Sequence, residues 1–115
     1  RLPYNVGVLT QLVATEVLRH AEVLDAQAAA ICGARARLLV ELRRIAGVDA
    51  YESDANFILF RVANADQVFD GLKRRGVLVK NLHATHPLLT DCLRVTVGTP
   101  GENAQFLAAF AAQIA

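Results

Sequence analysis

The hydrophobic period of the chain changes after Gly47, and this change limits the folds that the chain can adopt. Before this glycine, apolar residues recur with the spacing of amphipathic helices. After it, short runs with a period of two alternate with further helical stretches. β-strands have a period of two because successive side chains point to opposite faces of a sheet. We therefore predict a helical start followed by a mixed region of helices and strands.

The helical start contains two predicted helices. The first covers about residues 5–19 and has apolar side chains around much of its circumference, so we expect it to be buried on more than one side. The second covers about residues 22–45, with acidic residues at its start and arginines at its end, which complement the helix dipole. Gly47 is expected to end it.

The mixed region contains four predicted strands and two more helices. One helix is predicted to begin at Asn64, with Gln67 completing a capping box, and to end at Gly76. The last helix follows a second capping box, formed by Thr99 and Glu102. The predicted strands cover residues 48–51, 56–62, 77–81 and 93–99. This order predicts an α+β fold, with helices on one face of a small, mainly antiparallel sheet, and the other face left for a layer that this chain does not supply.

Charge and composition argue against several classes of partner. The chain has 12 basic and 11 acidic residues, a net charge of +1, and no basic cluster interleaved with aromatic residues, so nucleic acid is not an expected ligand. No apolar run reaches the length of a membrane span. Cys32 and Cys92 show no metal-ligand spacing, and we expect both to be reduced core or near-core thiols of a cytoplasmic protein.

Arg94 is the strongest candidate for function. In the predicted strand it shares one face with Cys92 and Thr96, while its apolar neighbours share the other. A guanidinium held on a rigid strand presents donors that suit a carboxylate or a phosphate. From the residue alone, a solvated arginine on an edge strand is the competing interpretation. Lys80 has the same geometry on its own strand, and the two cations would form an anion site if these strands are neighbours.

The other polar candidates have simpler structural interpretations. Tyr4 and Asn5 are sufficiently explained as the capped start of a helix. Asn56 opens the strongest predicted strand, where asparagine is disfavoured, so it either hydrogen-bonds a turn, which we favour, or lines a site. His83 and His86 lie three residues apart without further ligands nearby, so we expect a solvated loop and no metal site.

Four short blocks, taken together, carry a resemblance to a known family. They cover residues 1–5, 53–60, 76–81 and 93–99. In this order and spacing the set resembles the C-terminal portion of the histidinol-phosphate aminotransferases, pyridoxal-phosphate enzymes of the aspartate aminotransferase fold type. The resemblance covers essentially the whole chain. It implies that residues 1–20 form a buried helix of the interdomain region, that residues 21–115 form the small C-terminal domain, and that a cofactor domain lies upstream. A start at Arg1 with no methionine fits this expectation.

The resemblance also implies a function. The family's enzymes are cytoplasmic homodimers of histidine biosynthesis, which exchange an amino group between glutamate and imidazole-acetol phosphate. Arg94 stands where the family binds the substrate's anionic group, the phosphate of one substrate and the carboxylate of the other. Lys80 stands where many relatives have arginine, so it keeps the charge but loses the planar fork. Tyr4, Asn5 and Asn56 are candidates for the border of the active site.

The family's cofactor lysine has no counterpart in the chain. Neither Lys73 nor Lys80 has the expected context, so we place the Schiff-base lysine and the other pyridoxal-phosphate ligands upstream, and we expect no catalytic residue here. Two alternatives stay open. The chain could be a stand-alone α+β regulatory or interaction domain that binds a small ligand at an oligomer interface. It could also belong to a related aminotransferase with another substrate. The broad apolar surface of the first helix predicts self-association of the chain when the native partner layer of this helix is missing.

Overall fold

The computed structural model describes residues 11–13, 15–16 and 19–114. The chain divides into two compact units, Arg1–Ala30 and Ile31–Ala115. In the described part of the first unit, the Thr15 hydroxyl donates a hydrogen bond to the Gln11 carbonyl over 2.8 Å. Most of the helix predicted over residues 5–19 falls outside the described residues.

Helix α2 (Ala21–Arg43) is the longest element, and it ends two residues before the predicted boundary. Its first turn holds Glu22 and its last turn Arg43, which is the charge arrangement that favours the helix dipole. The chain then turns through Gly47, whose φ of 82° lies in the left-handed region that residues with a side chain rarely adopt. Within the described ranges, no helix combines the length and apolar character needed to cross a membrane.

The second unit contains a four-stranded antiparallel sheet. Its strands are β1 (Val48–Ala50), β2 (Phe57–Val62), β3 (Lys80–Asn81) and β4 (Cys92–Thr96). Their spatial order is β1-β2-β4-β3, and every neighbouring pair is antiparallel. The connection from β2 through α3 (Ala65–Arg74) therefore passes over β4 to reach β3, a split β-α-β arrangement. The predicted α+β fold with a small antiparallel sheet is confirmed.

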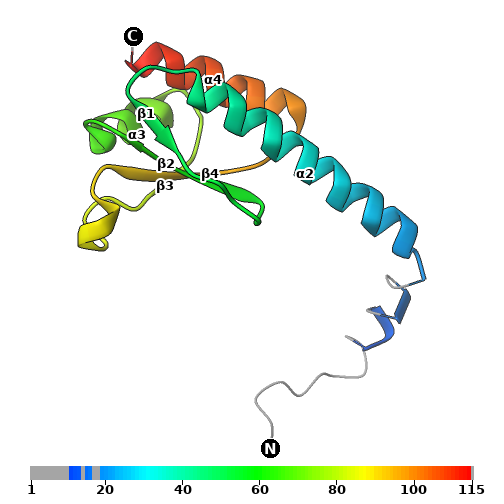
Figure 1. The fold of residues 1–115 in the computed structure, drawn as a ribbon. Helices are drawn as coiled ribbons and strands as arrows, with labels where there is room; N and C mark the ends of the chain where they lie inside the picture. The colour runs from blue at the N-terminus through cyan, green and yellow to red at the C-terminus, as the bar shows by residue number, and fades with distance from the viewer. Residues whose placement is uncertain (1–10, 14, 17–18, 115) are drawn as a thin grey trace, which may run out of the picture. The chain divides into compact units, whose positions relative to one another are not determined.

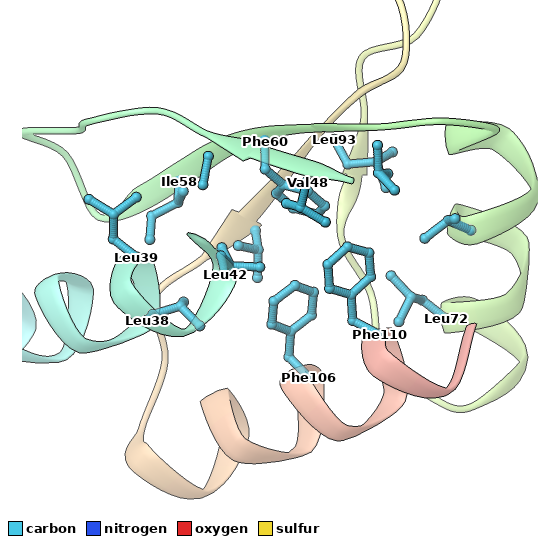
Figure 2. Packing of buried hydrophobic residues seen from close by; sticks show 14 of the residues in the cluster. Leu38, Leu39, Leu42, Val48, Ile58, Phe60, Leu72, Leu93, Phe106 and Phe110 are labelled. Carbon is cyan, nitrogen blue, oxygen red and sulfur yellow. The ribbon is translucent and has the colours of Figure 1, made fainter. Parts of the chain in front are cut away.

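The hydrophobic core lies on one face of this sheet, between the strands and helices α2, α3 and α4 (Figures 1 and 2). Alternate residues of β2 and β4 supply the strand side, and the part of α2 from Ile31 onward lies beside α4 (Pro100–Ile114) on the same face of the sheet. Phe60 sits at the centre, with its ring centroid 5.2 Å from that of Phe110 and 6.0 Å from that of Phe106. Tilted aromatic pairs at these separations add to the free energy of burial.

Strand β3 is shorter than predicted, in part because the end of α3 uses residues 76 and 77. The Gly76 N–H donates to the Lys73 carbonyl over 3.0 Å, and the Val77 N–H donates to the Leu72 carbonyl over 2.9 Å. This is a Schellman motif, and it requires the left-handed conformation that Gly76 adopts at a φ of 79°. Residue 77 therefore closes the helix, and β3 covers Lys80–Asn81 instead of residues 77–81.

The capping box predicted at the start of α3 is wrong. Asn64 has a φ of 58°, and its side chain forms no capping hydrogen bond. A side-chain N-cap usually requires an extended backbone at the capping residue, so this conformation is unsuited to it. The Ala65 N–H instead donates to the carboxylate of Asp91 over 3.3 Å, across 26 residues of sequence. A residue from the turn before β4 thus caps α3.

The capping box predicted at the start of α4 is confirmed. The Thr99 N–H donates to the Glu102 carboxylate over 2.9 Å, and the Glu102 N–H donates to the Thr99 hydroxyl over 3.2 Å. The pKa of Glu102 lies below its usual value, first because its carboxylate accepts the Thr99 backbone N–H and second because it interacts with the Thr99 side chain. The cap is therefore strongest when Glu102 is ionised.

Candidate functional site

The face of the sheet turned away from the helices carries Arg94. On β4, Leu93 and Val95 are buried in the core, so the side chain of Arg94 between them falls on the opposite face, where it is half-buried. We call this surface the open face; Figure 1 shows the helices on the other side of the sheet. Its strand positions include Phe57, Leu59, Arg61, Lys80, Arg94 and Thr96.

Lys80 and Arg94 are directly opposite each other on neighbouring strands. The β3–β4 register pairs the two residues, and such pairs place their β-carbons about 5 Å apart. Among the described residues, no carboxylate forms an ion pair with either cation. Like charges in this position destabilise a sheet, so the arrangement favours the binding of an anion that neutralises both.

The guanidinium of Arg94 has an unusual environment. Its central carbon lies 4.6 Å from the centroid of the Phe57 ring, in a cation–π contact. Its Nε atom is buried and has no hydrogen-bond partner within the described part of the chain. A buried donor without a partner costs about 1–3 kcal/mol, and such groups are rare in native proteins unless they have a role. Arg94 is thus held in place without being neutralised.

Arg61, the other arginine of the open face, has a different environment. Its Nε donates to the Thr90 carbonyl over 3.0 Å, and its two terminal nitrogens donate to the Leu88 carbonyl over 2.7 Å and to the Tyr51 hydroxyl over 3.0 Å. All three nitrogens are engaged, so Arg61 anchors the loop before β4 and is not available to a ligand in this arrangement. Of the two arginines, only Arg94 remains a candidate for anion binding.

Sequence reasoning did not identify Phe57 or Arg61 as part of this surface. The segment that forms β2 is mostly apolar, so its two faces are not distinguished by composition. The available signal was the alternation itself, which places Phe57, Leu59 and Arg61 on one face while the intervening residues fill the core. The role of each residue then depends on what lies opposite on β4 and in the loop before it.

Asn56 is not brought together with Arg94. It lies just before β2, and its carbonyl accepts the Val97 N–H over 2.8 Å. Since Val97 is buried in the core, strand alternation places the Asn56 side chain on the helix side of the sheet. Tyr4 and Asn5 lie outside the described residues.

His83 and His86 accept hydrogen bonds from the backbone of the loop before β4. The Asp91 N–H donates to Nδ1 of His83 over 2.8 Å, and Nε2 of His83 lies 4.0 Å from the Asp66 carboxylate. In the same loop, the Leu88 N–H donates to Nδ1 of His86 over 3.1 Å. The expectation of a solvated loop is wrong for His83, whose side chain is only 30% exposed. In the described portion of the chain, no group of three or more His, Cys, Asp or Glu residues could hold a metal ion.

The two cysteines differ in burial. Both are free; Cys92 is buried as expected, whereas Cys32 is exposed on α2, so the expectation of a core or near-core thiol is wrong there. The reason is helical geometry. Cys32 lies two residues before Ala34, which begins the buried stripe of α2, and a two-residue step turns the side chain about 160° away.

A separate open cavity of about 620 Å³ lies beside α3. The cavity is lined by one acidic residue, Asp70, and one basic residue, Arg74. Amide side chains such as Gln67 and Gln113 also line it. It contains none of the open-face residues, so it is distinct from the pair formed by Lys80 and Arg94.

Comparison with known proteins shows which proteins the chain resembles. No family model matches the chain. It is 54% identical over 114 residues to histidinol-phosphate aminotransferase 1 of Ralstonia nicotianae, a match that covers 99% of this chain and 30% of that protein. It is 53% identical to histidinol-phosphate aminotransferase 2 of Cupriavidus pinatubonensis, covering 99% of this chain and 31% of that protein. These matches fall in the C-terminal part of the relatives.

The chain is homologous to the C-terminal part of histidinol-phosphate aminotransferases. The resemblance inferred from the four sequence blocks is therefore confirmed. The crystal structure of the histidinol-phosphate aminotransferase from Clostridium acetobutylicum has the same fold over 99% of this chain and 35% of its own, with a TM-score of 0.85 at 20% identity. The chain spans about a third of the length of the relatives that it matches.

Proposed function

We propose that this chain is the substrate-anion-binding part of a histidinol-phosphate aminotransferase. The whole enzyme exchanges an amino group between glutamate and imidazole-acetol phosphate, giving histidinol phosphate and 2-oxoglutarate. The observation that carries the proposal is the pair of cations, Lys80 and Arg94, opposite each other on the open face with no carboxylate partner among the described residues.

The two cations suit the two substrates differently. The Arg94 guanidinium offers a fork of donors that accepts either a carboxylate or a phosphate through two hydrogen bonds. Lys80 adds a second positive charge as a compact ammonium group without the planar geometry of arginine. Because a phosphate monoester carries more negative charge than a carboxylate, Lys80 contributes more to binding the phosphorylated substrate than to binding glutamate.

The residues of this chain do not fit a pyridoxal-phosphate site. The sequence contains two lysines, Lys73 and Lys80. Lys73 is exposed near the end of α3, and Lys80 is exposed on an edge strand beside Arg94. A cofactor lysine needs an enclosing pocket and groups that hold the ring and the phosphate. We therefore propose that the cofactor is bound by sequence outside this chain, and that this chain acts only on the substrate.

The proposal also includes the domain organisation, the oligomeric state and the cellular location of the enzyme. Residues 1–20 form the interdomain helix, residues 21–115 form the small domain, and the enzyme is a cytoplasmic homodimer. The apolar residues Leu12, Val13, Val23 and Leu24 of the first unit support a covering partner, since all four are exposed in this chain. Exposed apolar groups of this kind mark surfaces that other protein layers cover.

The test is steady-state kinetics of the enzyme that contains this chain. Arg94→Ala is expected to raise KM for both glutamate and imidazole-acetol phosphate by roughly ten- to a hundredfold, since hydrogen bonds to a charged group are lost. Arg74→Ala, at an exposed site on α3, is the matched control and should leave both KM values unchanged. If Arg94→Ala lowers kcat while both KM values hold, the anion-binding role is refuted.

A further inference from the structure

On the open face, Arg94 contacts an aromatic ring and forms no ion pair with the described residues. We propose that Phe57 is a positioning residue for Arg94, whose ring fixes the guanidinium so that it can receive the substrate anion. This inference rests on the anion-binding function proposed for Arg94, and it adds a residue that supports that function without touching the substrate.

Strand register places the two side chains in contact. Arg94 pairs with Leu59 across the β2–β4 ladder, and Phe57 pairs with Thr96, so Phe57 is the diagonal neighbour of Arg94 on the same face. Aromatic and long side chains reach each other across such a diagonal. The observed separation of 4.6 Å between the guanidinium carbon and the ring centroid is well inside the range of cation–π attraction.

A ring face orients the cation without competing for its ligand. A carboxylate in this place would hold Arg94 by occupying its N–H donors, and the substrate anion would then have to displace it. The negative face of a phenyl ring attracts the cation while leaving the in-plane donors unbonded. Among the described residues, Arg94 is in this state: it has a ring contact and no ion pair.

The burial of Nε adds a geometric consequence. The Nε atom is enclosed and unbonded, so solvent does not reach this donor in the structure. The donors that a ligand can approach are those on the two terminal nitrogens. A bidentate anion therefore binds through these two nitrogens, at the end of the side chain. Phe57, by fixing the guanidinium, sets the direction from which the anion is bound.

The test compares Phe57→Leu, which keeps an apolar side chain but removes the ring, with Phe57→Tyr, which keeps the ring. In the enzyme that contains this chain, Phe57→Leu is expected to raise KM for glutamate and for imidazole-acetol phosphate about threefold with little change in kcat, the size expected for a cation–π contact at a partly exposed site. Phe57→Tyr should stay close to the unmodified enzyme. Leu59→Ala, on the same face, controls for lost packing.

A second measurement reports the contact directly. In NMR spectra of the 115-residue chain, the Arg94 Nε–H resonance should carry a ring-current shift that Phe57→Leu removes and Phe57→Tyr retains. Melting temperatures of all variants show whether a KM effect follows stability instead. A KM rise in Leu59→Ala equal to that in Phe57→Leu, at the same loss of stability, overturns the positioning role.

The outcomes separate this inference from the proposed function. If Arg94→Ala raises both KM values and Phe57→Leu leaves them unchanged, the positioning role of Phe57 is refuted and the anion-binding role of Arg94 stands. If Arg94→Ala itself leaves both KM values unchanged, the anion site is refuted, and the role of Phe57 in substrate binding is refuted with it.

Discussion

The opposition of Lys80 and Arg94 predicts that replacing Lys80 with glutamine stabilises the fold. The β3–β4 register pairs these residues, and no carboxylate of the described chain offsets their charges. Taking a charge separation of about 7 Å and the dielectric constant of water, Coulomb's law gives a repulsion of about 0.6 kcal/mol. In a domain of this size, losing that repulsion raises the melting temperature by about 2–4 °C.

Salt dependence tests the electrostatic origin of this gain. Thermal unfolding of the chain and of Lys80→Gln, followed by circular dichroism, should show the full difference at about 0.01 M salt, where the screening length is about 30 Å. At about 1 M salt, where it is about 3 Å, the difference should nearly vanish. Lys73→Gln removes the same charge from the last turn of α3, where it favours the helix dipole, so this control should be slightly destabilising.

A double-mutant cycle gives the decisive comparison. In an Arg94→Gln background, Lys80→Gln has no cation opposite and should give no gain in stability. The reasoning is refuted if Lys80→Gln is destabilising at low salt, or if its gain persists unchanged at high salt and in the Arg94→Gln background. The expected result means that the repulsion between Lys80 and Arg94 lowers the stability of the fold and that a bound anion would offset it. Such a loss of stability is common at functional sites.

Two further predictions concern local structure. Glu102→Gln keeps an acceptor for the Thr99 N–H but removes the charge; because the folded-state pKa of Glu102 is lowered, its stabilisation is present above its unfolded pKa and disappears as pH falls through the folded value. Urea unfolding against pH should therefore show a flatter acid limb in this variant, and an unchanged acid limb would contradict the assignment. Arg61→Lys keeps the charge but cannot reproduce all three hydrogen bonds, so we expect a loss of about 1 kcal/mol in stability and faster amide exchange in residues 88–92. Unchanged exchange there would show that Arg61 does not anchor the loop.

Features held by short-range hydrogen bonds could be predicted from the sequence. The capping box of Thr99 and Glu102 and the helix end at Gly76 each depend on residues within a few positions of one another. The alternation of β4 is equally local, and it correctly placed Arg94 on the face opposite Leu93 and Val95. Local geometry alone decides these features, because the partners are adjacent along the chain.

Features that depend on a distant partner could not be predicted in this way. Asparagine is a favoured N-cap residue, but the side chain of Asn64 forms no capping hydrogen bond. Asp91, 26 residues beyond Ala65, supplies the cap instead. His83 looked like a solvated loop residue, but it accepts a hydrogen bond from the backbone of that same aspartate. At Ala65 the side chain of Asp91 replaces the local cap, and at His83 the backbone of Asp91 supplies a hydrogen bond eight residues along the chain. Both contacts depend on where the chain places Asp91, which residue spacing does not specify.

The candidate site combines both kinds of information. The amino-acid sequence alone establishes the similarity to the C-terminal part of histidinol-phosphate aminotransferases, the α+β class and the face of the strand on which Arg94 lies, since these follow from residue order and from the two-residue period of a strand. Only the tertiary structure decided that Lys80 lies opposite Arg94 and that Phe57 lies against its guanidinium. Strand order and register create these contacts, and both are set by how the helices bury one face of the sheet, which residue spacing alone does not specify.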